Sequence, residues 1–272
     1  MAETNLRGNV ARGRLVNILV KYHFIIFSYQ HPETVGVEKM IGEILTLIDP
    51  CMTVVKKTAP DGRLIKYDLA HSVFDMEAYC KITENFIFEF LESTNLVDIE
   101  KEHQKNFLKA LKINDRIREE DYYAHVGHMK FNCTKAQKEK REKIISDIKE
   151  PDSELVNELI VVANRKLKER HRPQSVKKED FIWDFNCKFD WGMKTADPIS
   201  KVPFHNKDKS SWMNKKTREI QATGPEHFQE TGIRLYSRNN LAVNEVNQAF
   251  DEICHGKEVS TRSTSQGFDH KN

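Results

Sequence analysis

Two kinds of apolar spacing alternate along this chain, and together they limit the folds open to it. Helical spacing of apolar side chains predicts three amphipathic helices, in residues 14–29, 35–48 and 153–172. β-Type runs predict short strands on either side of Asp61-Gly62, a dipeptide typical of a tight hairpin turn. Since neither spacing dominates, the expected class is α+β, with helices around a small mixed β-sheet.

The stretch from His71 to Lys112 predicts a second hairpin. Tyr79 to Thr83 and Phe86 to Leu91 are β-type runs that meet at Glu84-Asn85. Phenylalanines alternate in the second run, so they share one face of a strand, and Glu92 continues that face at the strand's end.

Acidic residues gather around this predicted hairpin. Asp75 and Glu77 precede its first strand, while Glu89 lies on the face opposite to Glu92. Carboxylates at the end of a buried apolar face can line a cation site. Solvated strand ends are the more common arrangement of such acids, and the pattern alone leaves both interpretations open.

The overall charge does not point to a polyanionic partner. Hydrophobic residues make up 39% and charged residues 31% of the 272 residues, which is typical of a globular protein. The 43 basic and 41 acidic residues nearly cancel, so binding to RNA would need a local basic patch.

The sequence predicts a cytoplasmic protein with reduced thiols and no membrane partner. No apolar run reaches membrane-spanning length, and no signal-type stretch precedes Leu15. The five cysteines are widely spaced and lack a C-x-x-C pair. His125 and His128 are three residues apart, but Gly127 weakens a helix there and no third ligand is evident, so we expect no zinc site.

Three regions are expected along the chain. Residues 1–172 form an α+β domain, residues 173–255 an aromatic and basic appendage or linker that is mostly helical or irregular, and residues 256–272 a disordered tail. Within the first region, Pro151-Asp152 interrupts the chain, and Asp152 is the expected N-cap of the helix that follows.

Several short motifs follow one another in an order that resembles a known enzyme family. They are Val37-Glu38-Lys39-Met40-Ile41-Gly42, Pro60-Asp61-Gly62, Tyr79-Cys80-Lys81-Ile82-Thr83-Glu84-Asn85 and Glu89-Phe90-Leu91-Glu92. Over roughly residues 14 to 110, their order resembles the cap-snatching endonuclease at the N-terminus of the large polymerase protein of segmented negative-strand RNA viruses, most closely the hantavirus type. The resemblance implies a PD-(D/E)xK-like nuclease core.

The resemblance also implies a set of metal ligands. It assigns this role to His23, Glu38, Glu77 and Glu92. The family places Pro-Asp before the tyrosine motif, whereas this chain has Met76-Glu77, so Asp75 is an alternative to Glu77. One extra residue, Cys80, follows the tyrosine, so Glu89 is likewise an alternative to Glu92. The catalytic lysine would come from the following helix, as Lys105 or Lys101.

The implied chemistry is metal-dependent cleavage of RNA. Two divalent ions can activate water and stabilise a pentavalent phosphorane, and a histidine among carboxylates favours Mn²⁺ over Mg²⁺. The expected partners are RNA and the remaining part of a viral polymerase. The alternative is an interaction or RNA-binding protein without catalysis, in which the acids are solvated and the aromatic C-terminal segment docks on a partner.

Overall fold

The computed structural model describes residues 30–83, 85–190, 195–197, 200, 203–205, 212–214 and 228–255. The predicted helix of residues 14–29, the candidate ligand His23 and the predicted tail of residues 256–272 lie outside the described residues. The chain divides into two units, one of residues 35–123 and one that combines residues 1–34 with 124–272. Helices and small sheets occur in both units, so the predicted α+β class is confirmed.

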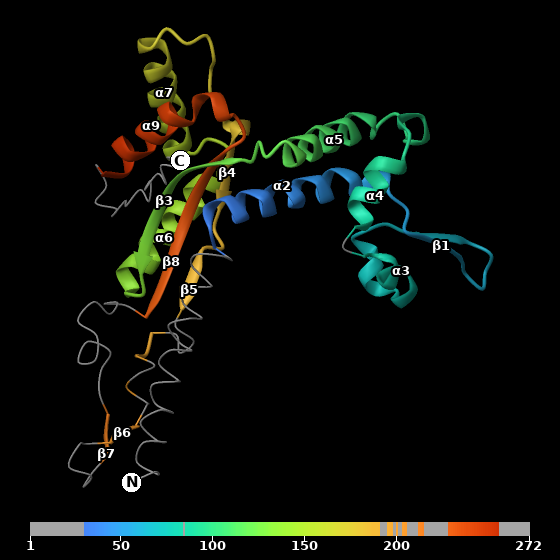
Figure 1. Cartoon of the computed structure of the whole chain (residues 1–272), viewed down its shortest axis with the longest axis horizontal. Helices are drawn as coiled ribbons and strands as arrows, with labels where there is room; N and C mark the ends of the chain where they lie inside the picture. Colours follow the sequence, from blue (N-terminus) through green and yellow to red (C-terminus); the bar gives the residue numbers. More distant parts are fainter. Residues whose placement is uncertain are drawn as a thin grey trace, which may run out of the picture. The chain divides into compact units, whose positions relative to one another are not determined.

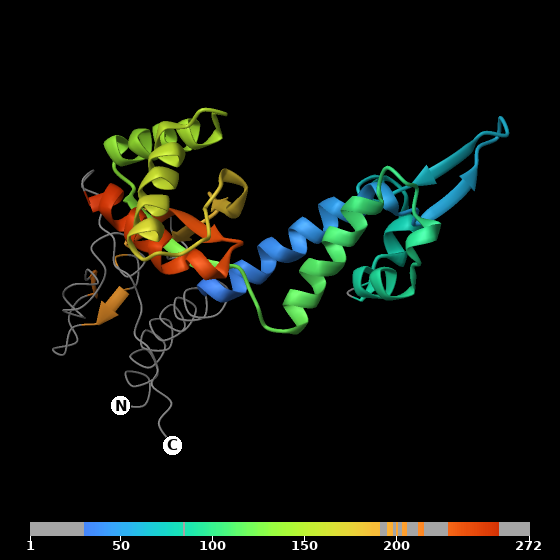
Figure 2. The ribbon, with the colours of Figure 1, turned by 90° about the horizontal axis from the view of Figure 1, so that it is seen from above.

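The unit of residues 35–123 is built on two helices. Helix α2 (Pro32–Ile48) and helix α5 (Gln104–Arg118) run side by side in both views (Figures 1 and 2). Met40, Ile44 and Ile48 lie four residues apart on α2 and are fully buried, which gives this helix one apolar face. Tyr123 Oη donates a 2.9 Å hydrogen bond to Glu43 on the same helix.

The first predicted hairpin is confirmed. Strands β1 (Val55–Thr58) and β2 (Leu64–Tyr67) pair in antiparallel register, and 3-10 helix η2 (Asp49–Cys51) precedes them. Gly62 has a φ of 83°, a left-handed backbone that glycine adopts without steric cost. The Asp-Gly signal therefore located this turn correctly.

The second predicted hairpin is wrong, because both of its strands are helical. Short 3-10 helices η3 (His71–Phe74) and η4 (Leu96–Asp98) flank α3 (Met76–Lys81) and α4 (Phe86–Ser93). The Asp75 carboxylate accepts a 3.0 Å hydrogen bond from the Ala78 amide and so caps α3. On α4 the aromatic side chains pack toward a helix instead of a sheet, with Phe90 meeting Phe107 of α5 edge-on at 5.9 Å between ring centroids.

The other unit is organised around an antiparallel sheet whose central strand, β8 (Gln229–Ser237), was not predicted. This strand pairs with β3 (Ala124–Asn132), β4 (Phe181–Asp184) and β5 (Lys188–Asp190) (Figure 1). The strand order is β3–β8–β4, and β5 also pairs with β8. A separate pair joins β6 (Pro203–His205) to β7 (Trp212–Asn214). All the strand pairs described are antiparallel.

One face of this sheet carries the hydrophobic core. Met129, Phe131, Ile233 and Leu235 are at most 2% exposed and belong to one apolar cluster with residues of three helices. These helices are α6 (Lys135–Lys149), α7 (Glu154–Glu169) and α9 (Val243–His255). Trp183 and Phe185 of the aromatic segment pack against the same cluster. The aromatic segment thus contributes to the core of this unit.

The ends of α7 are fixed by polar contacts. Ser153 is its N-cap, accepting a 3.2 Å hydrogen bond from the Val156 amide, so the prediction that Asp152 caps this helix is wrong. At the basic C-terminal end, Arg165 and Lys166 each lie 2.8 Å from a carboxylate oxygen of Glu252 on α9.

Two short 3-10 helices complete this unit: η5 (Lys178–Asp180) precedes β4, and η7 (Asn240–Ala242) precedes α9.

Candidate functional site

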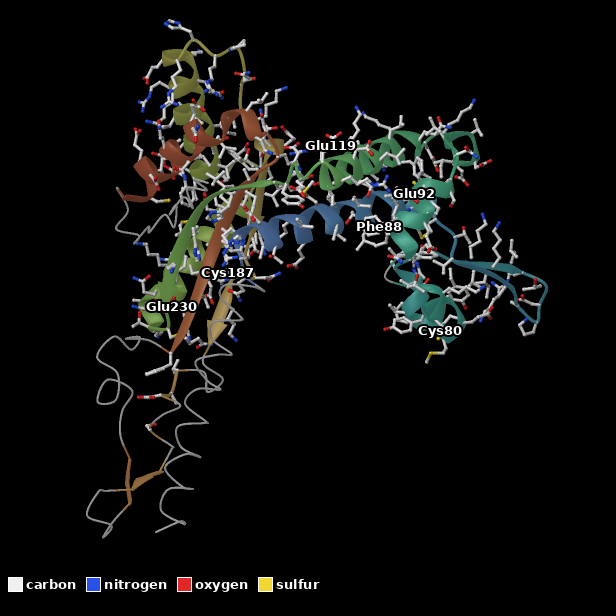
Figure 3. The ribbon with its side chains drawn as sticks, in the orientation of Figure 1. Cys80, Phe88, Glu92, Glu119, Cys187 and Glu230 are labelled. Carbon is white, nitrogen blue, oxygen red and sulfur yellow. The ribbon has the colours of Figure 1, made fainter. Side chains whose placement is uncertain are left out.

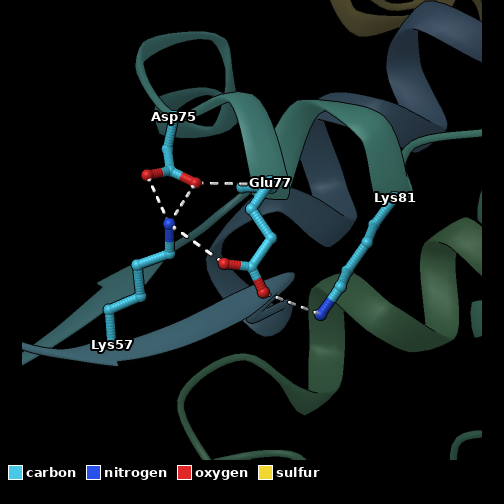
Figure 4. A network of polar contacts seen from close by, with 5 residues as sticks. Lys57, Asp75, Glu77 and Lys81 are labelled. Carbon is cyan, nitrogen blue, oxygen red and sulfur yellow. Dashed lines mark hydrogen bonds and ion pairs between the residues drawn. The ribbon is translucent and has the colours of Figure 1, made fainter.

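Two of the predicted metal ligands do come together, but around an ammonium group. Nζ of Lys57 lies 2.7 Å from Asp75 Oδ2 and 3.1 Å from Glu77 Oε2 (Figure 4). Lys81 adds a second cation at 3.7 Å from the other oxygen of Glu77. The negative charge of both carboxylates is thus already balanced by lysines of the same unit.

The carboxylates of the predicted second strand point elsewhere. Glu92 lies on α4 (Figure 3) and forms an ion pair with Arg118 at the end of α5. Glu89 is an exposed residue of the same helix, and Glu38 is exposed on α2. Residues two apart share one face of a strand, but they point in different directions on a helix. Because this segment is helical, Glu92 does not continue the face of the phenylalanines, and the predicted acidic strand end does not form.

The candidate lysines are exposed. Lys105 lies in the first turn of α5 and Lys101 in the turn just before it. Next to them, Glu100, Glu102 and His103 offer three ligand atoms within 4.8 Å of one another, the one such group among the described residues. Both glutamates are exposed, and His103 Nε2 already lies 3.2 Å from Glu102 Oε1.

A more unusual arrangement occurs on the sheet face opposite the hydrophobic core. A bulge in β3 between His125 and Gly127 shifts the register, so that His125 faces Tyr236 and His128 faces Arg234. Residues directly opposite in an antiparallel pair share a face, and Arg234 and Tyr236 are two apart on β8. Both histidines therefore lie on the same face as these two residues, although histidines three apart on a regular strand would lie on opposite faces. Asp184 of β4 faces Arg234 from the other side.

The charged centre of this face is nearly closed to water. Arg234 is 7% exposed and Asp184 is 3% exposed, while Tyr236 is completely buried. Nε of Arg234 is buried without a hydrogen-bond acceptor. Nε2 of His125 is also buried without a hydrogen-bond partner, and the hydroxyl of Tyr236 lies close enough to the Arg234 guanidinium for that group to act on its pKa. Buried polar atoms are seldom left in this state.

Burial and the Arg234 charge set the protonation states here. Burial lowers the pKa of His125 to about 4 and that of His128 to about 3, and the nearby guanidinium adds to both effects. Burial also raises the pKa of Tyr236 to about 12. Both imidazoles and the phenol are thus neutral at physiological pH, and each can donate a hydrogen bond.

At the edge of this face, the backbones of Gly232 and Cys187 lie close together. The Gly232 amide donates a 2.6 Å hydrogen bond to the Cys187 carbonyl, and His128 Nε2 lies 3.5 Å from Cys187 Sγ. A Cβ atom on Gly232 would lie 2.1 Å from His128 Nε2, so the glycine provides the space that the imidazole occupies. Next to Cys187 in the sequence, the Lys188 carbonyl accepts a 2.7 Å hydrogen bond from Gln30 Nε2.

No sequence pattern predicted that these residues meet, although His125 and His128 stood out as a pair. The signal available was the run Ile233-Arg234-Leu235-Tyr236, in which polar and apolar residues alternate as on a strand with one apolar face. The bulge that aligns the two histidines depends on pairing between β3 and β8, which lie about a hundred residues apart in the sequence. No local pattern marks such a pairing.

Three curated relatives of this chain share one name. No family model matches the chain. It is 27% identical over 218 residues to deoxynucleoside triphosphate triphosphohydrolase SAMHD1 of Mus musculus, which covers 78% of this chain and 28% of that protein. The human protein of the same name is 29% identical over 212 residues, covering 78% of the chain and 29% of the relative. The Xenopus laevis protein is 26% identical over 238 residues, covering 86% and 33%.

These relatives overturn the predicted function. The similarity runs over most of the chain, whereas the resemblance to a cap-snatching endonuclease rested on short motifs in little more than a third of it. The assignments to a viral polymerase and to cap-snatching RNA cleavage are therefore wrong. The chain spans about a third of the length of the curated relatives it matches.

Among the helices that the structure describes, none combines the length and the apolar character needed to cross a membrane.

Proposed function

We propose that this chain is part of a divalent-cation-dependent hydrolase of deoxynucleoside triphosphates, and that it binds such a nucleotide. The supporting observation is its similarity, over 78% to 86% of its length, to relatives that carry the name of this activity. Because the chain corresponds to 28% to 33% of those relatives, we assign it a part in the reaction and not the whole of it. We also assign its α+β fold to this hydrolase class and not to the PD-(D/E)xK-like nucleases.

A divalent cation fits this substrate class on chemical grounds. The phosphate oxygens of a nucleoside triphosphate are hard ligands that Mg²⁺ or Mn²⁺ bridges, and the ion offsets the charge that develops during cleavage. In the part of the chain that the structure describes, the group of Glu100, Glu102 and His103 fits one exposed ion at most. The described residues therefore do not supply the predicted centre of two ions.

The test is binding and turnover by the whole chain. We expect dATP, dGTP, dCTP or dTTP to raise the melting temperature as its concentration rises, because a ligand of the folded state stabilises it by mass action. Deoxyadenosine, which lacks the phosphates, should give no shift. Each nucleotide is measured with Mg²⁺, with Mn²⁺ and with a chelator, and release of inorganic triphosphate is followed in parallel.

The outcomes separate the two parts of the proposal. Binding with release of triphosphate supports both nucleotide recognition and hydrolysis by this chain. Binding without release supports recognition and places the reaction centre outside the chain. If none of the four nucleotides shifts the melting temperature with either ion, the proposal is wrong.

A further inference from the structure

A cavity lies among helices α6, α7 and α9 and strand β3, on the side of the sheet that carries the hydrophobic core. Its volume is about 390 Å³. Protein interiors leave few gaps larger than a water molecule, which takes up about 30 Å³ of the liquid. Sites for small molecules usually measure about 300 to 1,000 Å³, so this cavity is large enough for a small ligand.

The inner end of the cavity is apolar. It is lined by Met129 of β3, Leu155 of α7 and Cys254 of α9, all of them buried, and by the partly buried Ile144 of α6. Thioether and thiol groups are weak hydrogen-bonding partners, and the two aliphatic side chains offer none. The part of a ligand that is seated here is therefore apolar. A nucleobase, whose edge carries strong donors and acceptors, would lose its hydrogen bonds to water at this end.

The outer end of the cavity is charged. Lys140, Lys143, Ile144 and Asp147 follow one another at three- and four-residue spacing, so they share one face of α6. Lys143 is exposed, so the cavity reaches the surface here, and it forms no ion pair with any residue that the structure describes. Lysine stems can lie along apolar surface while the ammonium group stays in water. Lys143 can therefore hold its charge at the opening of the cavity.

Two carboxylates line the same opening, and both belong to the N-terminus of α7. Asp147 accepts hydrogen bonds from Ser153 Oγ at 2.8 Å and from the Glu154 and Leu155 amides at 3.2 and 3.3 Å. Glu154 is an exposed residue in the first turn of α7, where the helix dipole favours a negative charge. Since Lys143 has no such partner, the group that complements this opening is an anion.

We propose that this cavity binds a small amphipathic anion, with its apolar body against Met129, Leu155 and Cys254 and a carboxylate beside Lys143. Burial of the apolar body drives binding. The ion pair adds less, about fivefold in affinity at most, because it lies at the surface. The inference does not rest on the proposed function, because a nucleoside triphosphate has no apolar body of this kind.

Decanoate, below the concentration at which it forms micelles, is the probe, and the whole chain is studied by NMR with labelled methionine and isoleucine methyl groups. We expect decanoate to shift the methyl signals of Met129 and Ile144 and to raise the melting temperature, since a ligand of the folded state stabilises it. The signal of Met76, exposed on α3 in the other unit, should stay in place. If the Met129 and Ile144 signals also stay in place throughout the titration, the proposal is wrong.

Lys143→Met tests the carboxylate contact. It should weaken decanoate binding by about fivefold and leave the binding of decanol, which has the same chain without a charge, unchanged. Lys138→Met is the matched control, because it removes the same charge from an exposed residue of α6 that does not line the cavity. Equal decanoate affinities of the two variants would overturn the proposal. So would tighter binding of decyltrimethylammonium than of decanoate, since that ligand carries the opposite charge.

Ile144→Phe tests the location. Its larger ring takes up part of the cavity, so decanoate affinity should fall by about tenfold or more. The variant should still fold, because Ile144 is only partly buried. If it binds decanoate as the unmodified protein does, the ligand lies elsewhere and the proposal is wrong. If it fails to fold, Lys143→Met and the Met129 signal still decide.

A titration with dATP separates this inference from the proposed function. We expect dATP to leave the Met129 signal in place. If dATP shifts that signal and displaces decanoate, the cavity binds a nucleotide and its assignment to an amphipathic anion is wrong. If decanoate binds here while dATP binds nowhere on the chain, the cavity site stands and the proposed function fails.

Discussion

Nζ of Lys57 lies 2.7 Å from both carboxylate oxygens of Asp75, so one ammonium group joins the β1–β2 hairpin to the first turn of α3 (Figure 4). The same carboxylate caps α3 through the Ala78 amide. A residue that the sequence suggested as a metal ligand is thus a junction between two elements. The two contacts can be separated by substitution.

Asp75→Asn should keep the cap and lose the ion pair, since asparagine is also a good N-cap residue. The Lys57 ammonium lowers the pKa of Asp75, so this stabilisation is present at neutral pH and is lost as the pH falls through the lowered pKa, below the ordinary value of 3.8. We expect Asp75→Asn and Lys57→Met to melt slightly below the unmodified protein at neutral pH and to converge with it in acid. A difference that persists unchanged in strong acid would show that the ion pair is not its source.

Acid should destabilise the unit that contains His125 and His128. In the unfolded chain both histidines take up protons near pH 6.5, whereas in the folded protein they do so only near pH 4 and 3. Stability therefore falls as the pH drops from about 6.5 toward 4, by on the order of 1.4 kcal/mol per pH unit for each histidine. The groups that hold these pKa values low are Arg234, Lys130 and His31, in addition to burial.

Urea unfolding at a series of pH values measures this dependence. The double variant His125→Phe, His128→Gln should show a shallower loss of stability between about pH 6.5 and 4, whatever its absolute stability. Lys168→Met, which replaces an exposed residue of α7 that does not titrate in this range, is the control and should leave the slope unchanged. An identical slope in the double variant would contradict the assignment.

The N-cap of α7 distinguishes the structure from the sequence-based prediction. Ser153→Ala should cost about 1 kcal/mol of unfolding free energy, because the buried Val156 amide loses its acceptor. Asp152→Ala should change stability by no more than about 0.5 kcal/mol, since Asp152 is exposed and Ser153 caps the helix. Chemical denaturation of both variants measures the difference. The reverse order of effects would restore Asp152 as the cap.

Glycine substitutions report on the bulge of β3. A Cβ atom on Gly127 would lie 2.3 Å from the ring of Phe250, which is 2% exposed, so Gly127→Ala should destabilise the protein by about 1 to 3 kcal/mol. Gly42→Ala is the matched control, because nothing lies within 4 Å of its Cβ position in the interior of α2. It should stabilise the protein by about 0.5 to 1 kcal/mol through helix propensity. A neutral Gly127→Ala would mean that Phe250 can move aside.

Local sequence patterns predicted the secondary structure correctly where contacts within a single helix or turn determine it. The apolar spacing of α2 and the Asp61-Gly62 turn each fix a conformation through neighbours a few residues away. The run Phe86 to Leu91 was ambiguous, because its alternating phenylalanines suit a strand while the same residues suit a short apolar helix. In the structure this run is helix α4, and its Phe90 ring packs edge-on against Phe107 of α5.

The sequence by itself determined the α+β class, the amphipathic helices of residues 35–48 and 153–172 and the first hairpin, because these depend on periodicity and turn chemistry within each segment. Only the tertiary structure decided which polar residues meet. It placed Lys57 between Asp75 and Glu77, and it brought Arg234 next to both His125 and His128. The reason is that strand register and a single bulge set the face of every side chain on β3, and pairing with a strand about a hundred residues away fixes that register.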